Sequence, residues 1–167
     1  MSTNTTMKTV SASQVEMTEL VLPHYTNQLG NLMGGQIMHW MDIAAAMAAI
    51  RHTGQVCVTA GVDEISFFEP IRLGDMVILR SSVNRAFRTS MEIGVKVFLQ
   101  KRTGQLVHAN TAYFTFVALD EHRDPSPVPE ITPESDEEHR RYDEAMFRRN
   151  SRLEHRQALK QWKELKR

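Results

Sequence analysis

The sequence predicts an α+β fold in which a long antiparallel sheet wraps around one central helix, followed by a C-terminal helical extension. The helix, from about residue 34 to residue 52, is apolar on nearly every side and must therefore be enclosed. Only strand patterns follow it, up to residue 119, and a sheet curved around the helix is the economical way to bury it. One sheet face covers only part of the helix, so the remainder and the sheet edge invite a second copy of the chain.

The bulk composition indicates one domain with a real core plus an appendage. The 167 residues carry no formal net charge and the pI is about 7.1, so nothing favours a nucleic-acid or membrane partner. Cys57 is the single cysteine, which leaves no intrachain disulfide and no cysteine-based zinc site. The start of the chain lacks a hydrophobic signal core, and the longest apolar run, residues 43–50, is too short to cross a bilayer. We therefore expect a reduced, soluble, cytoplasmic protein.

The first part of the chain is expected to pass from a disordered start into the central helix. Residues 1–12 are rich in Ser and Thr without a period, which is typical of disorder. Residues 15–22 then predict a strand that Pro23 stops. A polar loop continues to about Met33, and the helix that follows ends at Thr53-Gly54.

The middle of the chain predicts four further strands. Residues 56–67 are rich in β-branched side chains, and 76–86 follow a turn that Pro and Gly mark. Residues 91–100 alternate between apolar and mostly polar, so one face is buried. Thr103-Gly104 indicates a hairpin turn. Residues 105–119 become apolar on both faces, as in a central strand.

The end of the chain predicts a linker and a charged helix. Residues 123–133 contain three prolines and separate the main domain, residues 13–122, from the extension at 134–167. Thr132-Pro133 resembles an N-cap followed by Pro at the first helical position. The last 34 residues carry 8 acidic and 10 basic side chains, so the charges nearly cancel and a nucleic-acid arm is disfavoured. We interpret this segment as a mostly solvated helix with one side on a neighbouring subunit.

Asp42 is the acid in the apolar helix that most needs an explanation. Its neighbours from residue 37 to 50 are otherwise apolar apart from His39, and no basic residue lies within one turn. A buried carboxylate is costly unless it is paired, protonated or used in chemistry. The alternatives are a cap of neighbouring backbone or a pair with an Arg, but the apolar surroundings favour a functional role.

The helix start has features of an anion site. Gly34 and Gly35 place free backbone N–H groups at the N-terminus of the helix, where a developing negative charge is welcome. They also allow a substrate carbonyl to approach closely, although a merely flexible helix start is the alternative. Asn27 lies in the preceding polar loop, where turns commonly use Asn. An acid, an amide and an anion hole in one segment point to hydrolysis of an acyl compound.

Helix geometry predicts that these groups form two half-sites. Gly35 and Asp42 are two turns apart and share a helix face, but at ~1.5 Å per residue they are roughly 10 Å apart. One carbonyl carbon cannot easily reach both in a single chain. If both act on one carbon, Asp42 comes from a partner subunit and the active site lies at a dimer interface.

A basic stretch offers a site for phosphates. From Arg72 to Arg102 there are seven bases and two acids, and Arg88-Thr89-Ser90 combines a charge, two hydroxyls and backbone N–H groups in a turn. Outward-facing strand arginines are the alternative explanation. The seven His residues show no metal spacing, and no Gly-x-Ser-x-Gly motif is present. Serine-, thiol- and metal-dependent hydrolysis therefore lack their residues, and no cofactor is expected.

These segments resemble the hotdog-fold acyl-CoA thioesterases. The resemblance rests on Asn27 to Asp42 together with HWMDIAAAMAAIRHTG, VTAGVDEISFFEPIRLGD and TSMEIGVKVF, and it extends over roughly residues 15–145. The cytosolic, or brain, acyl-CoA hydrolases are the nearest type. The resemblance implies a sheet wrapped around a long helix, with dimers built into hexamers. It also implies a catalytic Asn from one unit and a catalytic Asp from its partner, which Asn27 and Asp42 match by position. Met33 stands where many relatives have His.

The resulting expectation is an enzyme that cleaves acyl-CoA into free fatty acid and CoA. Asp42 would serve as general base or nucleophile, and Asn27 would position water or the carbonyl. The N–H of Gly35 would stabilise the oxyanion, while Gly34 and residues 88–90 would contact CoA. The alternatives are a hotdog module that binds acyl-CoA without cleaving it, and a hotdog hydratase or dehydratase. Such hydratases typically pair a His with an acid, and no His is well placed beside Asp42.

Overall fold

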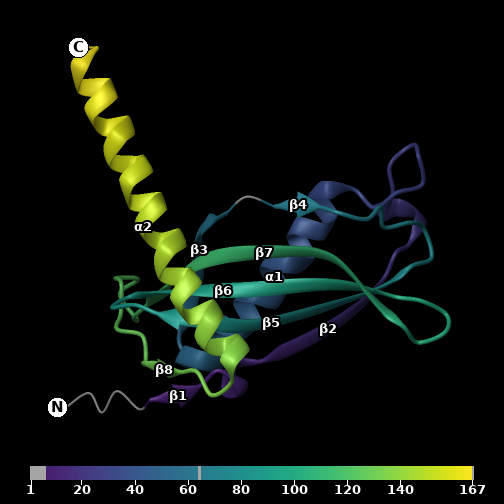
Figure 1. Ribbon diagram of the computed structural model, residues 1–167, viewed down its shortest axis with the longest axis horizontal. Coiled ribbons are helices and arrows are strands. Elements are labelled where there is room, and N and C mark those ends of the chain that lie inside the picture. Colours follow the sequence, from purple (N-terminus) through teal and green to yellow (C-terminus); the bar gives the residue numbers. More distant parts are fainter. Residues whose placement is uncertain (1–6, 64, 167) are drawn as a thin grey trace.

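A six-stranded antiparallel sheet forms the body of the protein in the computed structural model, which describes residues 7–63 and 65–166 (Figure 1). Five strands pair in the order β2-β5-β6-β7-β3. β4 also pairs with β7, at Asn110 and Thr111, next to the part of β7 that pairs with β3. The sheet strands are β2 (Val15–Leu20), β3 (Val56–Val62), β4 (Ser66–Phe67), β5 (Met76–Ala86), β6 (Ser90–Gln100) and β7 (Leu106–Leu119). The predicted strand at 56–67 is therefore two strands, separated at residues 63–65.

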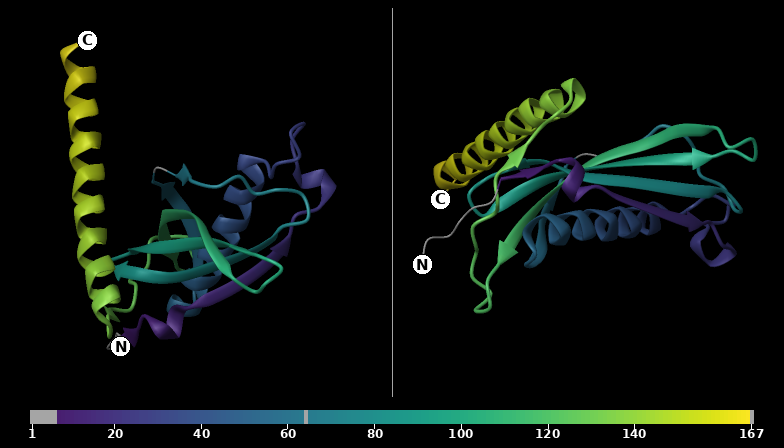
Figure 2. Two further views of the ribbon diagram at one scale, coloured as in Figure 1. Left: turned by 45° about the vertical axis from the view of Figure 1, so that its right-hand side comes forward. Right: turned by 90° about the horizontal axis from the view of Figure 1, so that it is seen from below.

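The central helix α1 (Gly34–Thr53) lies against the concave face of this sheet (Figure 2). Its alanines bring the helix backbone close to the strands, so that Ser81 Oγ of β5 donates to the carbonyl of Ala44 at 2.7 Å. Gly54 ends the helix in the left-handed region at φ 69°. The sheet side chains that enclose the helix include Val77, Leu79, Val83, Ile93, Val95, Phe114 and Phe116. The predicted helix and the predicted wrapping of the sheet are both confirmed.

The sheet leaves one side of α1 open. Met38, Ile43, Met47 and Ile50 remain between 37 and 50% exposed. Strand β3 is an edge of the sheet and also exposes apolar side chains, at Val56, Val58 and Val62. An edge strand with an apolar flank is a surface that proteins normally cover.

The segment before the sheet is more ordered than the sequence predicts. β1 (Lys8–Thr9) pairs in parallel with β8 (Ile131–Thr132), and the 3-10 helix η1 (Ser11–Ser13) follows it. The prediction of disorder is therefore wrong for residues 7–12, while residues 1–6 lie outside the described part. Ser13 is buried, and its hydroxyl is satisfied because it donates to the Val10 carbonyl and accepts from the Val83 N–H. A second 3-10 helix, η2 (Pro23–Tyr25), follows β2.

The C-terminal helix α2 (Asp136–Leu165) crosses the sheet on the face opposite α1 and extends past its edge (Figures 1 and 2). Its N-cap is Ser135, not the predicted Thr132, because Thr132 is engaged in strand β8. Ser135 and Glu138 form a capping box, with each side chain accepting from the other residue's N–H. Among the residues described, no helix is long and apolar enough to cross a membrane.

Candidate active site

Asn27 belongs to a tight loop that leads into α1. Its Oδ1 accepts from the N–H groups of Leu29 and Asn31, at 2.9 and 3.2 Å. Its own backbone N–H donates to the Asn31 carbonyl at 2.8 Å, and Gly30 enables the turn at φ 74°. Because the side-chain oxygen is engaged, the exposed amide group retains its N–H donors for a ligand.

The loop is fixed to its surroundings, so the start of α1 is well positioned. The Met33 N–H donates to the Tyr25 carbonyl at 2.9 Å, and the Leu32 N–H donates to the Ile71 carbonyl at 2.7 Å. Within the described residues, the N–H groups of Gly34 and Gly35 donate to no backbone or side-chain acceptor. Free N–H groups at the positive end of a helix favour an anion.

The glycine at position 35 is not required by packing within the chain. A Cβ built on Gly35 meets no heavy atom within 4 Å, and one built on Gly34 meets only the Phe67 ring at 3.9 Å. Neither residue has a positive φ. The open space above Gly35 therefore leaves room for a ligand or a second chain to approach its N–H.

An apolar pocket adjoins this helix start. Its volume is about 360 Å³, and it is lined by Asn31, Leu32, Gly34, Ile37 and residues 67–71. Phe67 and Phe68 form an exposed aromatic wall, 55 and 65% accessible. An apolar groove beside an anion-binding helix terminus suits a molecule with a hydrophobic chain and a carbonyl.

Asp42 is half-buried on α1 and has a partner that the sequence did not reveal. The Thr59 hydroxyl of β3 donates to Asp42 Oδ1 at 2.6 Å. The register of β3 against β7 shifts between Thr59 and Gly61, which is a bulge of the kind that re-aims a side chain. The sequence signal for this bulge is Gly61, because a glycine within a strand often marks one. Asp42 is thus hydrogen-bonded, as a carboxylate in apolar surroundings requires.

The structure places these groups at two positions along α1. Asn27, Gly34 and Gly35 gather at the N-terminus of α1, whereas Asp42 and Thr59 lie two helical turns along it. That separation is roughly 10 Å along the axis. One chain therefore presents an anion hole and an acid that do not face a common point.

The predicted phosphate-binding turn lies elsewhere in the same chain. Residues 87–89 connect β5 to β6, and Ser90, the first residue of β6, pairs with Val117 of β7. Phe67, beside Gly34, pairs with Asn110 of β7, so about 23 Å of strand lies between the two places. The carbonyls of Arg88 and Thr89 already accept from Val128 and Ala118. The structure does not bring Arg88, Thr89 and Ser90 together with Gly34 in one chain.

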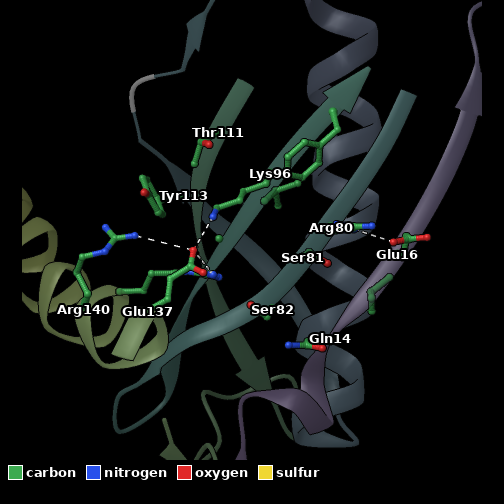
Figure 3. A pocket seen from close by; sticks show the side chains of 15 residues that line it. Gln14, Glu16, Arg80, Ser81, Ser82, Lys96, Thr111, Tyr113, Glu137 and Arg140 are labelled. Carbon is green, nitrogen blue, oxygen red and sulfur yellow. Dashed lines mark hydrogen bonds and ion pairs between the residues drawn. The ribbon is translucent and has the colours of Figure 1, made fainter. Parts of the chain in front are cut away.

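A larger cavity lies on the outer face of the sheet, beneath the first turns of α2 (Figure 3). Its volume is about 570 Å³, and Arg80 and Lys96 in its wall are paired with Glu16 and Glu137, each at 2.7 Å. Hydrogen bonds from Lys96 and then Arg141 lower the pKa of Glu137 to about 2. No predicted site residue lines this cavity. Two of the seven bases in the predicted basic stretch, Arg80 and Lys96, therefore form ion pairs within the chain.

The remaining candidate groups occupy structural positions. Across residues 7–63 and 65–166, no cluster of three or more His, Cys, Asp or Glu side chains is placed to hold a metal ion. Burial raises the pKa of the Cys57 thiol, so the thiol stays protonated and is a poor nucleophile. His52 is fully buried, with Nε2 2.8 Å from the Pro129 carbonyl.

Similar sequences carry a consistent set of names. A family model described as "Thioesterase superfamily" matches residues 29–105. The Bacillus subtilis protein named uncharacterized acyl-CoA thioester hydrolase YkhA is 40% identical over 151 residues, which are 88% of each chain. Mouse acyl-coenzyme A thioesterase 11 is 41% identical over 144 residues. The chain spans about a quarter of the length of that mouse relative, because the match covers 24% of it.

Solved structures with the same architecture include acyl-CoA hydrolases. The Staphylococcus aureus acyl-CoA hydrolase in complex with butyryl coenzyme A, coenzyme A and coenzyme A disulfide has a TM-score of 0.88 and 35% identity, covering 93% of this chain and 96% of that one. An apo-hexameric acyl-CoA thioesterase has a TM-score of 0.86 and 35% identity, covering 89 and 96%. Structures of the S. aureus enzyme with an Asn, an Asp or a Thr replaced by Ala are also similar. Those three positions have the same sequence spacing as Asn27, Asp42 and Thr59.

Proposed function

Because the chain belongs to the thioesterase superfamily and has its hotdog fold, we propose that it hydrolyses the thioester of an acyl-CoA to a free fatty acid and CoA. The observation that carries this proposal is the pair of half-sites, a hydrogen-bonded acid at Asp42 and free N–H groups at Gly34 and Gly35. Together they supply what acyl transfer to water needs, a base or nucleophile and an oxyanion hole.

Asp42 is the proposed acid–base or nucleophilic group. Its carboxylate lies among apolar side chains of α1 and accepts from the Thr59 hydroxyl at 2.6 Å. That hydrogen bond fixes one carboxylate oxygen and leaves the other to take a proton from water or to attack the thioester carbon. Thr59 is then a positioning residue for Asp42.

The helix start is the proposed oxyanion hole. The N–H of Gly35 would donate to the thioester oxygen as it gains negative charge, and the helix dipole adds to this effect. The Asn27 amide, whose N–H donors are free of the loop, would donate to the same oxygen or to the attacking water. Gly34 lets the CoA side of the substrate pass close to the backbone.

A complete site would require two chains. The open side of α1 and the apolar edge strand β3 form one continuous surface that a second copy can cover. In such a dimer Asp42 of one chain would complete the anion hole of the other. The hexameric assembly named for a structural neighbour supports a trimer of dimers for this chain.

The CoA phosphates are proposed to meet residues 88–90 of a different subunit from the one that supplies Gly34. About 23 Å of strand separates the two places within one chain, which favours a phosphate contact from another subunit. Arg88 is exposed and faces no carboxylate among the residues described. Its guanidinium is therefore available to a phosphate.

The test is thiol release from acyl-CoAs of graded chain length. The wild-type protein should release CoA, and Asp42→Asn should lose at least about a hundredfold in turnover, as expected for a lost catalytic base. Asp143→Asn, an exposed Asp on α2, is the matched control and should retain wild-type turnover. Wild-type turnover in Asp42→Asn would contradict the mechanism.

The same assay separates the rival functions. A module that only binds acyl-CoA would bind CoA in calorimetry without releasing thiol. A hydratase would add water to an enoyl-CoA while leaving the thioester intact. Either outcome with the wild-type protein would replace the proposed function.

A further inference from the structure

A buried ion pair fastens the middle of α2 to the sheet. Glu92 of β6 is fully buried, and Arg148 of α2 donates to both of its carboxylate oxygens at 2.7 to 3.2 Å. Asn84 adds a third donor at 3.1 Å, and the Arg148 guanidinium stacks over the Tyr113 ring at 3.6 Å. A carboxylate with this many fixed partners holds one geometry.

One turn further along α2, Arg152 extends this network to the edge of the sheet, at the end of β3. Its Nη1 lies 2.6 Å from Asp63 Oδ2 and 3.7 Å from Glu92 Oε2. Both side chains are mostly shielded, with 25 and 21% exposure. We call Glu92, Arg148, Arg152 and Asp63 the α2 clamp.

Asp63 lies between the two parts of the candidate site. It directly follows β3, and its N–H donates to the Tyr113 carbonyl at 2.9 Å. Thr59, the partner of Asp42, precedes it by four residues, and Phe67, in the wall of the pocket beside Gly34, follows it by four. β3 ends at Val62 and β4 begins at Ser66, so Asp63 anchors the end of β3.

We propose that Arg152 is a positioning residue for the acyl-CoA pocket. Its ion pair with Asp63, supported by the buried Glu92–Arg148 pair, fixes the β3–β4 connection and with it the wall that Phe67 and Phe68 form. This inference rests on the proposed function, because the wall is assigned to substrate binding. Asp42 and Thr59 are held by α1 and by the β3–β7 ladder itself, so the clamp acts on substrate affinity more than on the chemical step.

The α2 clamp can be tested against an ordinary role in helix stability. Arg152→Met keeps most of the apolar side chain and removes the charge, and Asp63→Asn removes the other partner. Arg156→Met is the matched control, because Arg156 lies one turn further along α2, is exposed, and makes no hydrogen bond or ion pair with the described part of the chain. Arg152→Lys keeps the positive charge and should therefore retain most of the wild-type behaviour in both readouts below.

Steady-state thiol release with the full chain gives the first readout. KM for acyl-CoA should rise about three- to tenfold in Arg152→Met, in Asp63→Asn and in the double variant alike, since the variants remove one shared contact. kcat should stay within about twofold of wild type, because the lost contact supports substrate binding equally in the ground state and in the transition state. An unchanged KM, or increases that multiply in the double variant, would overturn the inference.

Amide hydrogen exchange gives a second readout that needs no turnover. Residues 65–68 should exchange faster in Arg152→Met than in the wild type or in Arg156→Met, because their connection has lost its anchor. Equal exchange in all three proteins would also overturn the inference. Absence of thiol release from the wild type would refute the proposed function, and the exchange result would still decide the clamp.

Discussion

Asp42 shows how one hydrogen bond can satisfy a half-buried acid. Its apolar surroundings made an unpaired carboxylate costly, and the Thr59 hydroxyl meets that cost at 2.6 Å. The bond also fixes one carboxylate oxygen of Asp42. In the proposed mechanism the same bond orients the catalytic group.

Thr59→Val tests this arrangement because valine has nearly the same shape and no hydroxyl. We expect kcat to fall by about ten- to a hundredfold, as for loss of a hydrogen bond that orients a catalytic group. Thr18→Val, on the exposed side of β2, should leave kcat unchanged. A Thr59→Val protein with wild-type kcat would show that Asp42 needs no orienting donor.

Most residues of the proposed site could be proposed from the sequence, but not this donor. Asn27, Gly35 and Asp42 could be predicted because their chemistry is visible within one segment and helix geometry fixes their spacing. Thr59 lies on a different element, and its direction depends on a bulge that breaks the strand alternation. The position of residues 88–90 relative to Gly34 likewise depends on strand register, which side-chain patterns do not specify.

Among the elements, the helices and main strands were predictable and the short pairings were not. α1 is a long apolar run that Gly residues bound at each end, β6 alternates with period 2, and β5 and β7 are apolar runs between turn residues, so local patterns indicate each of them. β1 and β8 are two residues each and exist only because they pair with one another. The same pairing engages Thr132 and moves the start of α2 to Ser135.

His52 gives α1 a pH-dependent contribution to stability. Burial lowers its pKa, against the hydrogen bond to Pro129, and the nearby Lys8 lowers it further. The folded protein therefore favours the neutral ring, and this contribution is complete above the ordinary pKa of 6.5. It is lost as the pH falls below that value, because the unfolded chain binds the proton first.

The expected measurement is the melting temperature of wild type and His52→Gln between about pH 7.5 and pH 5. The melting temperature of the wild type should fall further over this pH window than that of His52→Gln. Gln is chosen because it keeps an N–H donor for the Pro129 carbonyl. His139→Gln, an exposed helix residue, serves as the control. Parallel curves for wild type and His52→Gln would contradict the linkage.

At the scale of the whole molecule, the two half-sites predict activity shared between subunits. Asn27→Ala and Asp42→Ala should each be nearly inactive alone while still forming the oligomer. After subunit exchange, a hybrid dimer contains one site with both groups intact. Random reassociation should therefore restore up to about a quarter of wild-type turnover.

The matched control mixes Asp42→Ala with Thr59→Val. Both changes affect the same half-site, so their hybrids contain no intact site and should gain no activity beyond the two variants alone. Exchange itself is followed by native mass spectrometry, with one variant of each mixture uniformly labelled with nitrogen-15. Failure of the Asn27→Ala and Asp42→Ala mixture to recover activity after proven exchange would place the whole site within one chain.

The pairing of β1 with β8 also has a consequence for how the protein is made. Lys8 and Ile131 are neighbours in space and lie near opposite ends of the chain. On the ribosome, Lys8 must wait roughly 6 to 25 s for its partner to be synthesised. Closure of so long a loop is a late event in folding. This small two-stranded sheet therefore forms only after all strands of the main sheet have been synthesised.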